Sequence, residues 1–151
     1  MADDTITSER TIAAPAQAIF DLIADPARHP DIDGSGTVVA SNGSADRLKL
    51  GSVFGMAMKL GAKYSTKSTI IEFEEGRAIA WQTAPVSRVL GLFVGGRIWR
   101  YELEPAGAGT LVKETWDIRQ EKVKALVRPV QPKVKPNMDA TLERIASLVE
   151  A

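Results

Sequence analysis

The stretch between residues 37 and 118 constrains the fold most, because turn residues divide it into short segments with the two-residue periodicity of strands. Asn42-Gly43, Leu60-Gly61 and Glu75-Gly76 mark three of these turns. The expected strands cover residues 37–41, 52–59, 63–73, 77–83, 97–103 and 111–118. Such short connections join antiparallel neighbours, because a parallel pair needs a long crossover. The sequence therefore predicts an antiparallel sheet.

One more strand and two short helices are expected before this stretch. TITSERTI alternates β-branched and polar residues, as a half-buried strand does. Pro15 fits the first turn of a helix with an apolar stripe of Ile19, Phe20 and Ile23. PARHPDID then predicts a second short helix or turn before Gly34.

The C-terminal segment has helical periodicity. Its apolar positions step by four, three and four residues: Met138, Leu142, Ile145 and Val149. Asn137 or the residue before it is the expected N-cap. Apolar residues in 123–130 predict one or two further helical turns before this helix. Pro129 and Pro132 must break or kink the helix between these turns and the C-terminal segment. This helix is the only long element available to cover the apolar face of the sheet.

Composition narrows the chemistry. The 151 residues are 44% hydrophobic and 25% charged, with 19 basic and 19 acidic side chains, which predicts one globular domain over residues 1–151. The absence of cysteine excludes disulfides and Cys-ligated metals, and a single histidine disfavours a metalloenzyme. We expect no metal, no cofactor and, given the zero net charge, no nucleic-acid partner.

The sequence also suggests a location. MADDTITSER lacks the features of a secretory signal, and no run of 18 apolar residues occurs, so we expect a cytoplasmic protein without an integral membrane segment. Charge is unevenly distributed, however: residues 119–135 contain six cations and only Glu121 as an acid. This basic segment is either a solvated face or a surface for anionic lipid head groups or a nucleic-acid backbone, and the lack of interleaved aromatic residues disfavours nucleic acid.

The order and several local motifs resemble a known family. The run AP…IFDLIADPARHPDIDGSG, the strand ending in ETWDI and the final helix are similar to the START-related polyketide cyclase/dehydrase (SRPBCC) superfamily, whose fold the birch-pollen allergen shares. The resemblance implies an α+β helix-grip fold: a curved antiparallel sheet of six to seven strands wrapped around a long C-terminal helix, with two short helices after strand 1. It also implies an elongated apolar cavity for lipids, polyketides or steroids. It does not imply one reaction.

Aromatic residues on adjacent strands are candidates for the cavity wall. Trp81, Trp99, Tyr101 and Trp116 either pack in the core or contact a ligand. The full set of expected ligand-binding residues is Phe54, Met56, Met58, Tyr64, Trp81, Arg97, Trp99, Tyr101, Trp116, Met138 and Leu142.

Glu114 is the candidate catalytic residue. It shares a strand face with Val112 and Trp116, so an inward carboxylate there would have a raised pKa and could act as acid, base or hydrogen-bond anchor. Arg97, two residues before Trp99, is a candidate partner on the same face. Alternatively, a bulge shifts the register and Glu114 faces water.

Two further segments are candidates for the mouth of the cavity. His29 and Asp33 lie in RHPDID, where they either contact a ligand, with His29 as a possible base, or only hold the loop. Residues 87–96 (SRVLGLFVGG) form an apolar, glycine-containing loop that could be a lid, a membrane contact, a dimer contact or the start of the next strand.

The leading hypothesis is a protein that binds or carries a small hydrophobic ligand between the sheet and the C-terminal helix. One alternative is a polyketide cyclase or dehydratase that uses Glu114 as general acid/base. Another is an interaction module that dimerises through residues 87–96. The chain is expected to be a monomer or a homodimer. The sequence does not decide whether it also makes a transient contact with a membrane.

Overall fold

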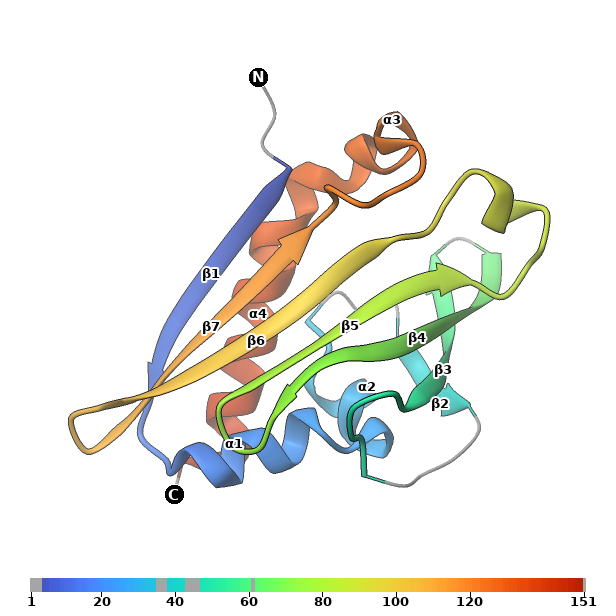
Figure 1. Cartoon of the computed structure of the whole chain (residues 1–151). Coiled ribbons are helices and arrows are strands. Elements are labelled where there is room, and N and C mark those ends of the chain that lie inside the picture. The colour runs from blue at the N-terminus through green and yellow to red at the C-terminus, as the bar shows by residue number, and fades with distance from the viewer. Residues whose placement is uncertain (1–3, 35–37, 43–46, 61, 151) are drawn as a thin grey trace.

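Seven strands form one antiparallel sheet (Figure 1). The computed structural model describes residues 4–34, 38–42, 47–60 and 62–150, with the backbone alone for 38–42, 58–60 and 62–64. The sheet order is β1-β7-β6-β5-β4-β3-β2. The strands are β1 (Thr5–Ile12), β2 (Val38–Asn42), β3 (Val53–Leu60), β4 (Ala62–Glu74), β5 (Ala78–Pro85), β6 (Arg97–Ala106) and β7 (Gly109–Asp117). This confirms the predicted antiparallel sheet, which β1 completes by pairing with β7.

The strand boundaries differ from the predicted ones by at most three residues, and those of β1 coincide with the prediction. The largest difference is at the end of β6, which continues past Leu103 because Ala106 still pairs with Gly109 across the β6–β7 turn. The register is irregular at two places, between Val38 and Ala40 and between Ile70 and Glu72. β7 has no such irregularity against either neighbour, so its inward and outward residues alternate as the sequence pattern requires.

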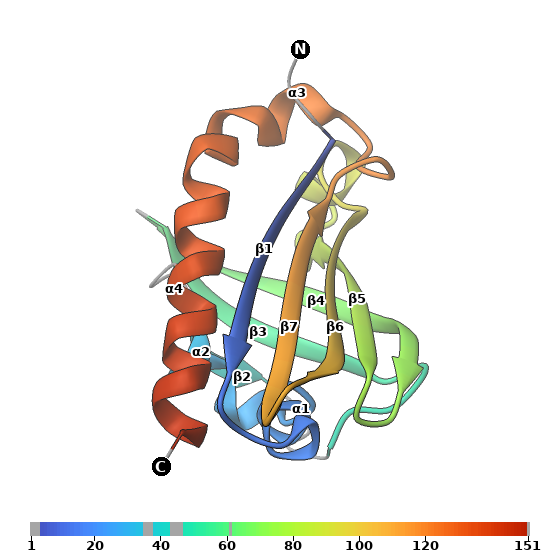
Figure 2. The same cartoon turned by 90° about the vertical axis from the view of Figure 1, so that its left-hand side faces the viewer.

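The helices lie at one end of the sheet and along one of its faces. The first group comprises α1 (Ala16–Ile23), a 3-10 turn at Pro26–Arg28 and α2 (His29–Ile32). The second comprises α3 (Lys124–Val127), a 3-10 turn at Arg128–Val130 and α4 (Gln131–Val149). Figure 2 shows the curved sheet beside α4, with α3 turned away from the α4 axis. The helix-grip fold is thereby confirmed.

The predicted start of the last helix was wrong. α4 begins at Gln131 rather than near Asn137, and Pro136 lies inside it. Pro132 falls in the first turn, where a missing N–H costs no helical hydrogen bond. Pro136 does remove one such bond, and the burial of Val134 and Met138 on either side of it offsets this loss.

The position of α4 leaves space over the middle of the sheet. Its sheet contacts are concentrated on β1, with fewer on β7. Ser8 of β1 donates a hydrogen bond to Asp139 of α4, and Lys135 donates to the Ser8 hydroxyl. One buried cluster joins α1, the sheet and the C-terminal half of α4, and a second surrounds Trp116 and Met138. Trp99 packs against both clusters.

Gly34 fixes the end of the α2 segment on α4. A Cβ at this position would lie 2.4 Å from the Asn137 carbonyl oxygen and 2.5 Å from the Thr141 nitrogen. The Gly34 N–H also donates to the Thr141 hydroxyl at 2.8 Å. Only a residue without a side chain can approach the helix backbone this closely.

Replacing Gly34 with alanine should therefore destabilise the fold by about 1–3 kcal/mol, because α2 must move away from α4. Urea unfolding measures the change. The matched control is Gly91→Ala, where a Cβ would meet nothing within 4 Å. Equal unfolding free energies for the two variants would show that the α2–α4 contact is not tight.

Candidate functional site

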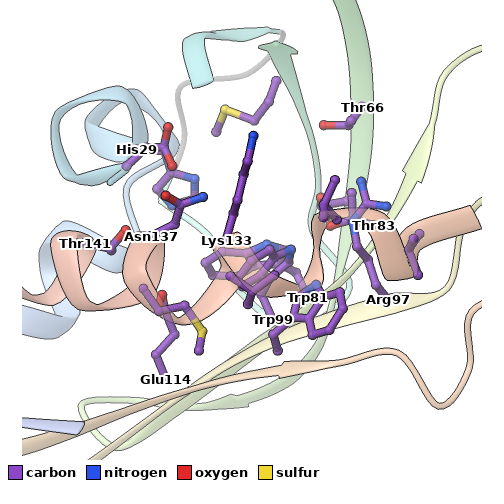
Figure 3. A pocket seen from close by; sticks show the side chains of 18 of the residues that line it. His29, Thr66, Trp81, Thr83, Arg97, Trp99, Glu114, Lys133, Asn137 and Thr141 are labelled. Carbon is purple, nitrogen blue, oxygen red and sulfur yellow. The ribbon is translucent and has the colours of Figure 1, made fainter. Parts of the chain in front are cut away.

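A cavity of about 430 Å³ lies between the sheet, α2 and the N-terminal half of α4 (Figure 3). This volume is within the range of small-molecule sites. The sheet contributes the largest share of the wall, and α4 contributes Lys133, Val134, Asn137, Met138 and Thr141. The lining residues that are exposed are Leu90, Leu126, Val130 and Lys133, in segments 85–94 and 126–133, so the cavity opens to solvent there. A ligand in this space would therefore have the sheet on one side and α4 on the other.

Most of the residues singled out from the sequence line this cavity. They are His29, Asp33, Phe54, Met56, Trp81, Arg97, Trp99, Tyr101, Glu114, Trp116 and Met138. Leu142 does not: it packs in the core, one helical turn beyond Met138, where α4 is close to β1 and α1. The side chains of Met58 and Tyr64 lie outside the described residues, although their backbones pair across β3 and β4.

Three tryptophans form a row across the sheet. Trp116 pairs with Trp99, and Trp99 pairs with Trp81, so the three side chains share one face of β7, β6 and β5. All three line the cavity, while Trp81 and Trp116 are also largely buried. These residues therefore have both of the roles that the sequence left open: they pack in the core and they form part of the cavity wall.

His29 belongs to an aromatic cluster that joins α2 to the sheet. Its ring stacks on Trp81 with centroids 5.2 Å apart, and its edge contact with Phe54 has a centroid distance of 5.3 Å. Trp81 also contacts Phe54 and Tyr101, each at 5.6 Å. These large rings interlock, so each restricts the movement of the others.

The hydrogen bond of His29 defines its protonation. Nε2 lies 2.8 Å from the Ile23 carbonyl oxygen and therefore carries the proton, which leaves Nδ1 as an acceptor. Burial lowers the pKa of His29, so the ring is neutral near pH 7. Asp31 is exposed and pairs with Arg28 at 2.7 Å, away from the ring. Among the described residues, no three His, Asp or Glu side chains meet in a way that could hold a metal.

Glu114 points inward, as its alternation with Val112 and Trp116 predicts. It is 2% exposed, and its Oε2 has no hydrogen-bond partner. Burial raises the pKa of Glu114 to about 8, a hydrogen bond from Tyr101 lowers it in part, and the negative charges of Asp33 and Asp139 raise it further. Burial also raises the pKa of Tyr101, which keeps its phenol protonated as a donor. Glu114 is consequently a mostly neutral carboxylic acid near pH 7.

The predicted pairing of Glu114 with Arg97 was wrong. Tyr101 stands opposite Glu114 in the β6–β7 register, whereas Arg97 lies four residues earlier on β6. Four residues of strand span about 13 Å, which is too far for an ion pair. Arg97 instead pairs across the sheet with Thr83, and Thr83 pairs with Ser68.

Sequence reasoning missed several polar residues of the wall: Thr66, Ser68, Thr83, Lys133, Asn137 and Thr141. The Ser68 and Thr83 hydroxyl oxygens lie 2.8 Å apart. A signal for Thr83 was present, since it alternates in phase with Trp81 on β5. Lys133 and Asn137 became visible only when α4 proved to begin at Gln131.

Residues 87–96 lie at the mouth of the cavity. They contain only a 3-10 turn at Leu90–Leu92, and β6 begins at Arg97, so this segment is not the start of the next strand. Leu90 and Val94 line the cavity, while Leu92 and Phe93 are 70% and 52% exposed. This exposure is compatible with the three other roles considered: a lid, a membrane contact and a dimer contact.

The basic segment 119–135 forms the facing side of the mouth and is tied to residues 87–96. The buried Glu121 carboxylate accepts hydrogen bonds from the Gly95 and Arg97 N–H groups, the latter at 2.9 Å. Lys122 donates from its side chain to the Gly91 carbonyl. Several cations of this segment pair with acids: Arg119 with Asp117, and Lys124 and Arg128 with Asp4. Lys133 lines the cavity.

Comparison with known proteins places this geometry in context. The chain is 35% identical over 108 residues to the uncharacterized protein Rv0088 of Mycobacterium tuberculosis, a match that covers 70% of this chain and 44% of that protein. The chain therefore aligns with less than half the length of this relative.

None of the described helices is long and apolar enough to span a membrane.

Several solved structures share the fold. CV1439 from Chromobacterium violaceum superposes with a TM-score of 0.74 at 18% identity over 98% of both chains. The ginseng major latex-like protein 151 from Panax ginseng gives 0.72 at 14% identity over 97% of both chains. DynU16, described as a putative protein in the dynemicin biosynthetic locus, gives 0.67 at 13% identity and covers 97% of this chain and 47% of its own.

The family assignment rests on the sequence itself. Residues 3–150 match the family described as polyketide cyclase/dehydrase and lipid transport. The sheet that curves beside a long C-terminal helix and the cavity between them agree with the fold that the sequence resemblance implied. This chain is a member of the polyketide cyclase/dehydrase and lipid transport family.

Proposed function

We propose that the protein binds a small hydrophobic molecule in the cavity and carries it unchanged. The observation that carries this proposal is an apolar cavity of about 430 Å³ whose wall includes the three-tryptophan row. The family description, which includes lipid transport, supports the same role. A carrier needs no reactive group, which suits a chain with one histidine and no cysteine.

The wall can supply enough binding energy for such a role. A ligand that buries about 300 Å² of apolar surface gains about 7 kcal/mol from desolvation. Part of this gain offsets the loss of ligand freedom on association. The apolar wall thus provides affinity, while the few polar side chains decide which ligands are accepted.

The first test looks for a ligand and for its contact with the wall. We expect mass spectrometry of the denatured protein, purified from cells, to detect a co-purified apolar molecule. We also expect the neutral dye N-phenyl-1-naphthylamine to quench the tryptophans on binding. Trp99→Ala should weaken dye binding about tenfold or more, because one ring of the wall is lost.

Leu50→Ala is the control, since Leu50 is exposed and outside the cavity wall. Each variant is first shown to unfold cooperatively. The carrier proposal is abandoned if no molecule co-purifies and the dye leaves the tryptophan emission unchanged.

A second candidate function is a dehydratase or cyclase, and the unpartnered Oε2 of Glu114 favours it. A carboxyl group with a pKa of about 8 can both take and give a proton near neutral pH. In a dehydration, its ionised form would take a proton from the carbon beside a ketone. The same group would then protonate the departing hydroxyl, which leaves as water while the carbon–carbon double bond forms.

Glu114→Gln separates the two functions, because glutamine keeps the shape of the side chain but cannot transfer its proton. The assay offers aromatic β-hydroxy ketones, whose dehydration gives an enone that absorbs in the near ultraviolet. The enzyme proposal expects turnover by the natural chain and none by the variant, with dye binding retained. The carrier proposal expects no turnover by either, and dye affinity within about threefold.

Burial of Glu114 also predicts how stability depends on pH. The pKa of Glu114 is about 8 in the folded chain and has an ordinary value near 4.5 in the unfolded chain. Between these values the unfolded chain ionises and the folded chain does not, so the unfolding free energy falls as pH rises. The change is on the order of 5 kcal/mol, complete above pH 8 and absent below pH 4.5.

Glu114→Gln should remove the part of the pH dependence that comes from Glu114. The unfolding free energy of the variant minus that of the natural chain should therefore increase from pH 5 to pH 8. Urea unfolding at several pH values measures the difference, in which the other carboxyl groups cancel. Parallel pH profiles for the two proteins would show that Glu114 ionises normally in the fold.

A further inference from the structure

A polar row crosses the sheet near the mouth of the cavity. Arg97 of β6, Thr83 of β5 and Ser68 of β4 are successive cross-strand partners, and all three line the cavity. The Ser68 and Thr83 hydroxyls contact each other at 2.8 Å. The tryptophan row separates this polar row from Glu114 and Tyr101. The cavity wall is therefore polar at two places, with an apolar section between them.

Arg97 has no protein counter-ion among the described residues. Arg47, Arg100 and Arg119 each pair with a carboxylate at 3.0 Å or less, but no salt bridge involves the partly buried Arg97. Its backbone is nevertheless fixed, because its N–H donates to Glu121. A guanidinium that is held in a cavity wall without a carboxylate presents its donors to whatever enters.

Lys133 adds a second positive charge from the opposite wall. It lies near the start of α4, is exposed, and lines the same cavity as Arg97. No salt bridge involves it among the described residues either. Figure 3 shows that both side chains extend from their backbones into the space between α4 and the sheet. The acids that line the cavity are Glu114 and Asp33, and the charge of Asp33 acts on Glu114 and Tyr101.

We propose that the ligand is an amphipathic acid whose anionic head group binds Arg97 and Lys133 at the mouth while its apolar body lies along the tryptophan row. This inference rests on the carrier function proposed above and specifies its ligand class. A carboxylate or a phosphate monoester would satisfy the guanidinium. One of the Ser68 and Thr83 hydroxyls donates to the other, so the second hydroxyl keeps one proton that it can donate to the head group. The head group stays near solvent, so little of its hydration is lost.

The orientation follows from the enclosed end of the cavity. Glu114 and Tyr101 are buried there, and a mostly neutral carboxyl beside a phenol repels no apolar tail. An ionised head group at that end would lose its water and face the carboxyl groups of Glu114 and Asp33. The acid therefore enters tail first.

The test compares ligands that differ only in the head group. Decanoic acid, decyl phosphate and 1-decanol each displace bound N-phenyl-1-naphthylamine from the full chain at pH 7. We expect at least one of the two acids to bind about tenfold or more tightly than the alcohol. The acid that binds more tightly identifies the head group as carboxylate or phosphate.

The Arg97→Gln variant should reduce this preference to below about threefold and leave the affinity for 1-decanol unchanged. Lys133→Gln should reduce the preference for the acid in part. The variant with both substitutions, Arg97→Gln and Lys133→Gln, should abolish this preference. Arg88→Gln is the matched control, because Arg88 is exposed at the mouth but does not line the cavity. It should retain the full preference.

The outcomes distinguish this inference from the function on which it rests. If all three ligands bind equally, or if Arg88→Gln acts like Arg97→Gln, the head-group site is wrong while the carrier function stands. If no apolar molecule co-purifies with the chain and the dye does not bind either, both the head-group site and the carrier function are wrong. Retention of the preference in the double variant would also overturn the assignment to Arg97 and Lys133.

Discussion

The attachment of α4 to one edge of the sheet is the constraint on which the rest of the structure depends. The chain offers one long amphipathic helix to cover a sheet of seven strands, and that helix packs chiefly on β1. The middle strands then face α4 across a gap that side chains fill only in part. Had α4 crossed the centre of the sheet, the tryptophans would form an ordinary core. The cavity is thus a product of topology before it is a product of particular side chains.

A cavity of this size persists only if its wall resists collapse, since unfilled space loses dispersion contacts. The rings of His29, Phe54, Trp81 and Tyr101 meet this need by bracing α2 against the sheet. The same residues provide apolar contact area for a ligand. Rigidity and binding therefore depend on one group of side chains, and a substitution there is expected to affect both.

The sequence predicted those features that depend on local periodicity. The strand alternation offered an inward Glu114 as one of two possibilities, and its burial confirms that one. The step of three and four residues identified the buried face of α4. Periodicity failed to predict the contacts between segments that are distant in the sequence. The partner of Glu114 is Tyr101 rather than Arg97 because cross-strand register, which no single strand specifies, decides it. Leu142 was misplaced for a similar reason, since the helix face is periodic but its distance from the sheet is not. The start of α4 was missed because a proline inside a helix is usually a terminator.

The hydrogen bonds of Glu121 and Lys122 have a consequence for how the cavity exchanges its contents. They join the loop before β6 to the loop after β7, so the two loops beside the mouth are linked to each other. A ligand wider than the resting opening would displace this linked pair as one body. The rate of exchange would then reflect the separation of that body from α3 and α4, with the sheet and its tryptophan row left undisturbed.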